Sequence, residues 1–203
     1  MNARIFSRKV RTSMLVAVPL VLALGLAGCT GNSDAGMPGT EHGTHPSAST
    51  DSASAVNSAD AMFVTMMIPH HQQAIEMSDM LLGKTGADEQ VRALARRVKD
   101  AQGPEIEQME TWLAEWNMEP AGQMSHGDGM MSADDMEALE AAQGNDAARL
   151  YLEQMIVHHE GAIEMAEVQL EEGRNPDVVA LAQAVVDTQA AEIAEMRELL
   201  TQL

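Results

Sequence analysis

An internal duplication constrains the fold of this chain more than any other feature. Eleven residues beginning at Met67 read Met-Ile-Pro-His-His-Gln-Gln-Ala-Ile-Glu-Met. Eleven beginning at Met155, 88 positions later, read Met-Ile-Val-His-His-Glu-Gly-Ala-Ile-Glu-Met and are identical at 8 of the 11 positions. A second match at an offset of 87 relates residues 91–109 to residues 178–196, with ten identical positions. Such a repeat indicates two copies of one helix–turn–helix unit.

The repeated segments carry the periodicity of amphipathic helices. The pattern predicts helices near 58–82, 88–117, 145–172 and 176–202. Helix-stop glycines and an Asn-Pro start signal support these boundaries, at Gly83, Gly173 and Asn175–Pro176. Four such helices with two tight turns predict an all-α fold, an antiparallel four-helix bundle made of two tandem helical hairpins, over residues 58–203.

Two features fall outside the plain repeat. The connection between the hairpins is expected to be a loop over 119–131, followed by a short helix that Ser132 caps and that ends near Gln143. Pro104 lies inside the second predicted helix, where its repeat partner is Ala191. Because proline removes a backbone donor, we expect a kink there.

The N-terminus has the pattern of an export signal. Four basic residues and no acidic ones precede an apolar run over 14–26, which ends in Leu-Ala-Gly before Cys29. The run is too short to span a membrane as a helix. The ending resembles a bacterial lipobox, so residues 1–28 are interpreted as a signal peptide and Cys29 as the lipidated first residue of a secreted protein anchored to the outer face of the membrane. Residues 29–57, rich in Ser, Thr, Gly, Ala and Pro, are expected to form a flexible tether.

The composition limits the classes of partner and ligand that this chain is expected to bind. The formal charge is −19, and removal of residues 1–28, which hold four of the 12 basic residues and no acidic ones, leaves −23. This charge repels nucleic acid and concentrates cations. Cys29 is the single cysteine, so an intrachain disulfide is excluded. Lipid on its sulfur would leave no free thiol, which excludes cysteine-based catalysis and thiolate metal binding. Fifteen methionines remain after the signal, and a thioether is both a core filler and a soft metal ligand.

Polar residues interrupt the apolar stripe of each predicted helix near its middle. They are His70, Gln102, Glu105, His158, Gln189 and Glu192. Antiparallel helices of similar length bring these positions to one height, and buried carboxylates must be paired or bind a metal. One interpretation is a structural network in which Glu105 and Glu192 accept hydrogen bonds from His70 and His158. The other is a metal site completed by thioethers from Met67, Met77, Met155 or Met165. His71 and His159 lie about 100° around the helix from their neighbours, so either histidine of each pair could face inward.

A second candidate site lies in the connecting loop. Three methionines and a histidine occur within eight residues, at Met124, His126, Met130 and Met131. Thioethers with imidazole suit Cu(I), and imidazole also suits Cu(II). The alternative is an oxidisable loop without a ligand.

The paired His-His-x-x-Ala-Ile-Glu-Met segments, the two Gln-x-x-Glu-Ile segments and the Gly-Met-Met-Ser linker resemble the domain-of-unknown-function 305 family over roughly residues 58–202. The resemblance implies an exported, ferritin-like four-helix bundle. It also implies copper binding through Met and His residues in some members. Carried over by position, the candidate ligands are His70, His71, Met67 and Met77, their repeat partners His158, His159, Met155 and Met165, and the loop 124–131. The chain departs from the family pattern at Gly103–Pro104.

The sequence leaves three candidate functions to compare. The first is a copper-binding lipoprotein for buffering, tolerance or delivery. The second is a non-catalytic interaction module whose polar layer is structural, with a homodimer or an unknown protein as partner. The third, a di-iron enzyme, needs Glu three residues before His on two helices. Met67, Ile68, Met155 and Ile156 stand there instead, so an enzyme is not expected.

Overall fold

A computed structural model describes residues 56–119 and 129–203. In those ranges the chain is all-α, with α1 (Ser58–Gly83), α2 (Glu89–Trp116), α3 (Ala133–Ala141), α4 (Gly144–Glu172) and α5 (Pro176–Leu200). The predicted helix ends agree with these bounds to within two residues. The predicted signal peptide, Cys29 and nearly all of the tether lie outside the described residues. No helix in the described part of the chain is long and apolar enough to cross a membrane.

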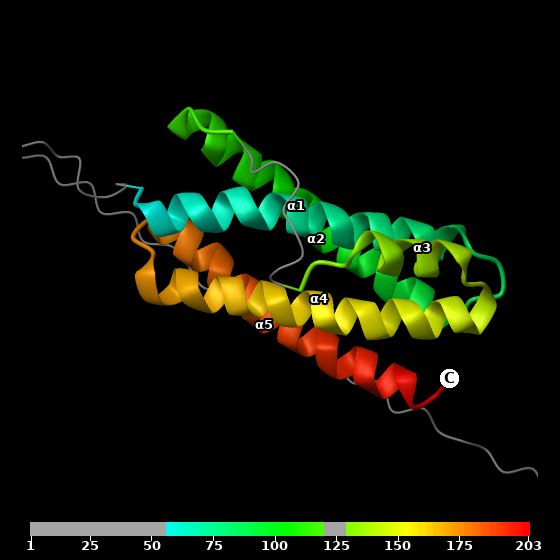
Figure 1. The fold of residues 1–203 in the computed structure, drawn as a ribbon. Coiled ribbons are helices and arrows are strands. Elements are labelled where there is room, and N and C mark those ends of the chain that lie inside the picture. The colour runs from blue at the N-terminus through cyan, green and yellow to red at the C-terminus, as the bar shows by residue number, and fades with distance from the viewer. Residues whose placement is uncertain (1–55, 120–128) are drawn as a thin grey trace, which may run out of the picture. The chain divides into compact units, whose positions relative to one another are not determined.

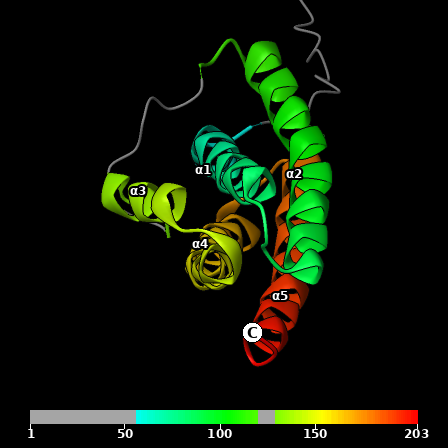
Figure 2. The same ribbon diagram turned by 90° about the vertical axis from the view of Figure 1, so that its right-hand side faces the viewer.

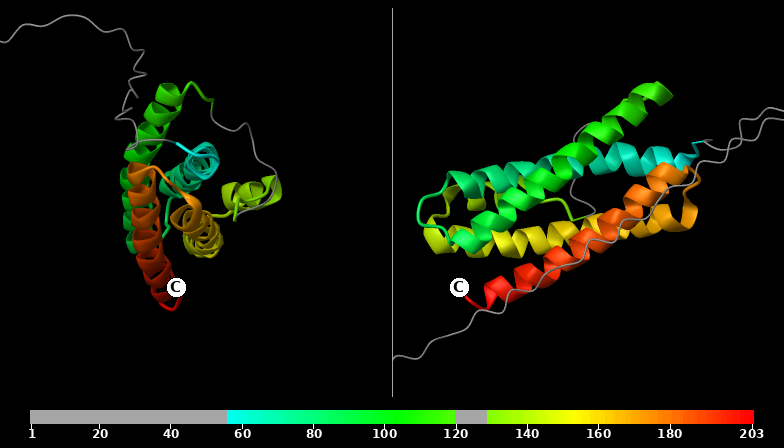
Figure 3. Two further views of the ribbon diagram at one scale, coloured as in Figure 1. Left: turned by 90° about the vertical axis from the view of Figure 1, so that its left-hand side faces the viewer. Right: turned by 180° about the vertical axis from the view of Figure 1, so that it is seen from behind.

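The four long helices form two antiparallel hairpins, α1 with α2 and α4 with α5 (Figure 1). Viewed along the helices, α1 and α4 form a central layer, α2 and α5 lie side by side on one face of it, and α3 covers the other face (Figure 2). The same arrangement is seen from behind in Figure 3. The predicted all-α bundle is confirmed. α2 continues through Pro104 as one helix, with a bowed axis (Figure 2).

The bundle core follows the predicted stripes. Their apolar side chains are buried in all four helices: Phe63, Met67, Ala74, Met77, Leu81, Val91, Ala95, Val98, Met109, Tyr151, Met155, Ala162, Val178, Ala182, Val185, Met196 and Leu199. Leu113 is also buried, whereas Trp112 packs at the edge of the core and stacks on Trp116. Aliphatic and methionine side chains thus fill a core that has few aromatic rings.

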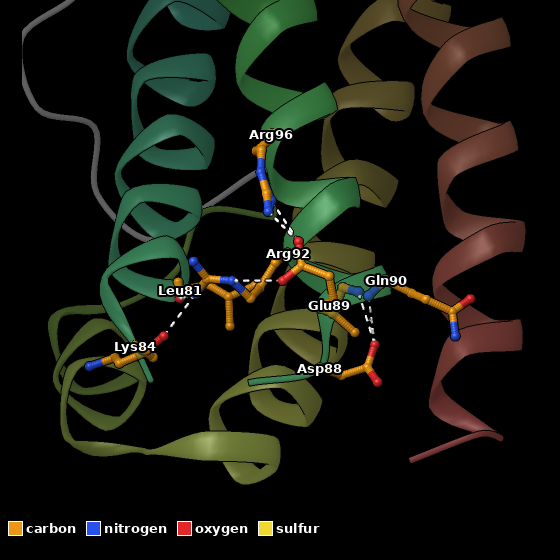
Figure 4. Close-up of polar contacts among 8 residues, drawn as sticks. Leu81, Lys84, Asp88, Glu89, Gln90, Arg92 and Arg96 are labelled. Atoms are coloured by element: carbon orange, nitrogen blue, oxygen red, sulfur yellow. Dashed lines mark hydrogen bonds and ion pairs between the residues drawn. The ribbon is translucent and has the colours of Figure 1, made fainter. Parts of the chain in front are cut away.

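The turn between α1 and α2 is held by side chains from the start of α2 (Figure 4). Asp88 caps the helix by accepting hydrogen bonds from the backbone N–H groups of Gln90 and Val91. Arg92 donates to the backbone oxygens of Leu81 and Lys84 at the end of α1, at 3.3 and 2.8 Å. These bonds satisfy carbonyls that the helix end leaves free, and they fix the hairpin angle.

Asp60 joins the other end of α1 to the turn between α4 and α5. The side chain is fully buried, and its carboxylate accepts hydrogen bonds from the backbone of Asn57, Arg174 and Asn175 and from the Gln169 amide, at 2.6 to 3.2 Å. Burial acts to raise the pKa of this carboxyl, but the four donors outweigh it and hold the pKa below 3.8. The charged carboxylate therefore stabilises the fold.

The connection into α3 crosses the central layer as a strap, residues 129–132. The side-chain amide of Gln73 in α1 donates to the backbone oxygen of Met131 and accepts from its N–H, at 2.9 and 2.7 Å. On the α4 side the strap approaches so closely that a Cβ on Gly129, whose φ is +80°, would lie 2.7 Å from the Val157 oxygen and 2.9 Å from the Cα of Gly161. Gly161 is the repeat partner of Gln73. One copy of the repeat therefore holds the strap with a side chain, and the other makes room for it.

We predict that Asp60→Asn lowers the free energy of unfolding by about 2–4 kcal/mol at neutral pH, because buried donors lose a charged acceptor. A lowered folded-state pKa stabilises the protein above pH 3.8 and ceases to do so as the pH falls through the folded value. Urea unfolding from about pH 7 down to pH 2 should therefore show the two proteins converging at acid pH. The exposed Asp100→Asn is the control. A difference that persists at acid pH would contradict the assignment.

We also predict that Gly129→Ala destabilises the bundle by about 1–3 kcal/mol, because the new Cβ meets backbone atoms and the residue needs positive φ. Gly83→Ala is the matched control, since its Cβ would meet nothing within 4 Å. The control should be neutral or slightly stabilising. Thermal unfolding of the three proteins checks this, and equal melting temperatures would show that the strap is not packed as described.

Candidate metal centre

Four histidines are buried together at the middle of the bundle, and we call them the histidine layer. They are His70 and His71 on α1 and His158 and His159 on α4, each with at most 2% of its surface exposed. The rings of His70 and His158 meet where α1 and α4 pack, with centroids 3.7 Å apart and planes inclined at 40°. The ring of His159 lies 6.3 Å from that of His158. Both histidines of each pair face inward.

The outer two histidines are paired with carboxylates of the neighbouring helix. His71 Nε2 lies 2.7 Å from Glu105 Oε2 on α2, and His159 Nε2 lies 2.7 Å from Glu192 Oε2 on α5. The expected pairing of these glutamates with His70 and His158 is therefore wrong. The 100° step between adjacent helix positions turns the second histidine of each pair toward the hairpin partner and the first toward the other hairpin.

These contacts fix where lone pairs are available. In a neutral ring, Nε2–H donates to the carboxylate and Nδ1 carries the lone pair. Nδ1 of His71 and Nδ1 of His159 are buried without a hydrogen-bond partner, and neither ring nitrogen of His158 makes a hydrogen bond of ordinary geometry. Burial, followed by the neighbouring imidazoles of His70, His159 and His71, holds the pKa of His158 well below 6.5. His158 is therefore neutral at pH 7.

The predicted thioether ligands differ in burial and in location. Met67, Met77 and Met155 are fully buried, and Met67 and Met155 lie one helical turn before the histidines. Met165 is half-buried and lines a surface groove instead. Met130 and Met131 are half-buried in the strap, whereas Met124 and His126 lie outside the described residues.

Within the described ranges, no three His, Cys, Asp or Glu side chains converge as a ready-made metal site. A site in the layer would have to combine imidazoles with thioethers or draw the histidines closer together. Sequence reasoning missed two structural residues, Asp60 and Gln73. The sequence did carry a signal for Gln73, since the equivalent position of the second repeat is Gly161. Nothing in the sequence near Asp60 indicated its partners more than 100 residues away.

Comparison with known proteins gives a family match over residues 60–200, to the family described as "Domain of unknown function (DUF305)". No protein with a curated function matches the chain. A solved DUF305 fragment from Deinococcus radiodurans is 31% identical with a TM-score of 0.68, covering 73% of this chain and 99% of that one. A putative secreted DUF305 protein from Streptomyces coelicolor is 34% identical with a TM-score of 0.67, covering 71% and 91%.

A third relative has been solved with bound metals. CopM in a Cu(I)-bound form is 35% identical with a TM-score of 0.60, covering 70% of this chain and 96% of that one. CopM has also been solved in Cu(II)-bound, Ag-bound and apo forms, at 34% identity.

We predict that His71 and His159 both carry their proton on Nε2 at about pH 8, because that nitrogen donates to a glutamate. Long-range proton–nitrogen NMR correlations of the imidazole rings distinguish the two tautomers. In Glu105→Gln the His71 ring should change its pattern while the His159 ring keeps it, and Glu192→Gln should have the opposite effect. A proton found on Nδ1 of both rings would contradict the pairing.

Proposed function

The chain belongs to the DUF305 family, and on that premise we propose that it binds copper through the histidine layer. The observation that carries the proposal is the buried Nδ1 of His71 and of His159, each without a protein partner while the opposite nitrogen bonds to a glutamate. A carboxylate behind the distal nitrogen of a histidine is the arrangement that orients metal-ligating imidazoles in proteins.

The donor chemistry favours copper over harder metals. Imidazole nitrogen with thioether sulfur from Met67 or Met155 is a soft to intermediate donor set, suited to Cu(I) and accepting Cu(II) through the imidazoles. The relative CopM, solved with Cu(I), Cu(II) and Ag, supports this choice. The acidic surface would raise the local concentration of any cation.

We propose further that the chain acts outside the cytoplasm as a lipoprotein anchored through Cys29, and that it buffers or delivers copper without catalysis. The N-terminal charge pattern and the similarity to a putative secreted protein support export. Copper is the cargo here rather than a cofactor for a reaction. Incorporation of labelled palmitate into the wild-type chain, lost in Cys29→Ala, tests the anchor.

The absence of three converging His, Cys, Asp or Glu side chains in the described ranges favours one alternative. In that alternative the layer is purely structural, the imidazoles and carboxylates fix the register of the helices, and the acidic bundle binds a protein partner. The two functions differ in whether a metal strengthens the fold.

Metal binding separates them. We expect the wild-type chain to bind Cu(I) tightly in competition with a chromogenic Cu(I) chelator, and to bind Ag(I) at the same site. The variant His71→Leu/His159→Leu should bind at least about 100-fold more weakly, because it loses two ligands. Glu105→Gln/Glu192→Gln should lose about 10–100-fold, the usual effect of removing groups that orient metal ligands.

The matched control is Met109→Leu/Met196→Leu. These two methionines are repeat partners, both fully buried, and lie on the helices that carry no histidine of the layer. The control should bind copper as the wild type does. Wild-type binding no tighter than micromolar would overturn the copper function and favour the interaction module. Tight binding retained by the histidine variant would move the site out of the layer.

A further inference from the structure

A small notch lies between α2 and α5 and is lined by residues of these two helices alone. Its volume is about 10 Å³, and it is lined by Ala101, Gln102, Glu105, Val185, Thr188, Gln189 and Glu192. The duplication explains why both helices contribute the same residue types, since Gln102 and Glu105 occupy the same repeat positions as Gln189 and Glu192. A three-residue spacing places each Gln and Glu on one face of its helix. The notch therefore receives the same two side chains from each hairpin.

The two glutamines in the notch lack a partner. Gln102 and Gln189 are each only 3% exposed, and the Oε1 atom of each is buried without a hydrogen bond. A buried carbonyl oxygen without a donor costs free energy, so such atoms in folded proteins usually accept from a water or bind a cation. Here both belong to side chains that line one notch.

The carboxylates add charge at the same place. Glu105 and Glu192 each use Oε2 to accept a hydrogen bond from a histidine, which leaves the second oxygen of each carboxylate available to a cation. Their side chains are 24% and 13% exposed, so they are shielded from water but reachable from it. Two carboxylates and two amide oxygens repel an anion and give a donor set made of oxygen alone.

From this geometry we propose that the notch binds one hard divalent cation, with Ca²⁺ the best match, between α2 and α5. Carboxylate and amide oxygens are the ligands of Ca²⁺, whose flexible coordination tolerates two helices that were not built around it. The volume matches a single water-sized particle. The cation would join the two hairpins on the face where α2 and α5 pack, and water would complete its coordination.

This site shares Glu105 and Glu192 with the histidine layer, where they orient imidazoles, but it uses different donor atoms. Its donors are oxygens, whereas the proposed copper ligands are nitrogen and sulfur on α1 and α4, and the notch binds its cation whether or not the layer binds a metal. A copper-free preparation therefore tests it, and failure of one proposal leaves the other standing.

The test is calcium binding to the full-length chain after treatment with a chelator. Calorimetry should show one equivalent of Ca²⁺ bound with a dissociation constant of about 0.1–1 mM, together with a rise in melting temperature. Gln102→Leu/Gln189→Leu should weaken this binding at least about tenfold while the His–Glu pairs stay intact. The control Gln108→Leu/Gln183→Leu makes the same change at exposed positions of the same helices and should bind as the wild type does.

A second measurement needs no variant. Mn²⁺ added to the isotope-labelled wild-type chain should selectively broaden the side-chain amide NMR signals of Gln102 and Gln189, with Gln154 as a buried glutamine outside the notch. Calcium binding that the Gln→Leu pair leaves unchanged, or Mn²⁺ broadening that spares both glutamines, would overturn the proposal. No uptake of Ca²⁺, Mg²⁺ or Mn²⁺ would also overturn it and leave water as the occupant.

Discussion

The contact between His70 and His158 is the constraint on which the rest of the bundle depends. Two imidazoles with centroids 3.7 Å apart inside a dry core cannot both be protonated, and the lowered pKa of His158 expresses this. The close approach of α1 and α4 also needs small neighbours. Ala74 and Ala162, one turn further along each helix, are fully buried and supply them. The packing of the central layer and the neutral state of His158 are therefore one requirement.

The polar groups in the middle of the bundle differ in donor type between the two pairs of helices. Nitrogen lone pairs gather on α1 and α4, at the centre, while the glutamate and glutamine oxygens lie on α2 and α5. Each glutamate belongs to both groups, since its Oε2 pairs with a histidine and its side chain lines the notch. A soft ion and a hard ion would therefore find different donors around the same carboxylates.

Much of this arrangement could be read from the sequence. Periodicity and end signals gave the helices, and the interrupted stripes placed His70, His158 and their neighbours at one height. The partner of each glutamate was not predictable in the same way, since a rotation of one residue moves a side chain by 100° and both histidines of a pair fitted the pattern. The hydrogen bonds of Asp60 were not predictable either, because three of its four donors are backbone groups, two of them in the distant turn between α4 and α5, and no residue pattern marks such donors.

The strap carries a consequence for how a duplicated domain can be built. It lies across the two central helices, and the facing positions are Gln73 on one side and Gly161 on the other. Two identical hairpins would place either glutamine or glycine at both positions. Two glutamines would leave no room for the backbone of the strap, and two glycines would form no side-chain hydrogen bond with it. Joining the two copies in a single chain allowed these positions to diverge. That divergence makes the α1 and α4 sides of the central layer unlike, so the two halves of the histidine layer lie in different surroundings.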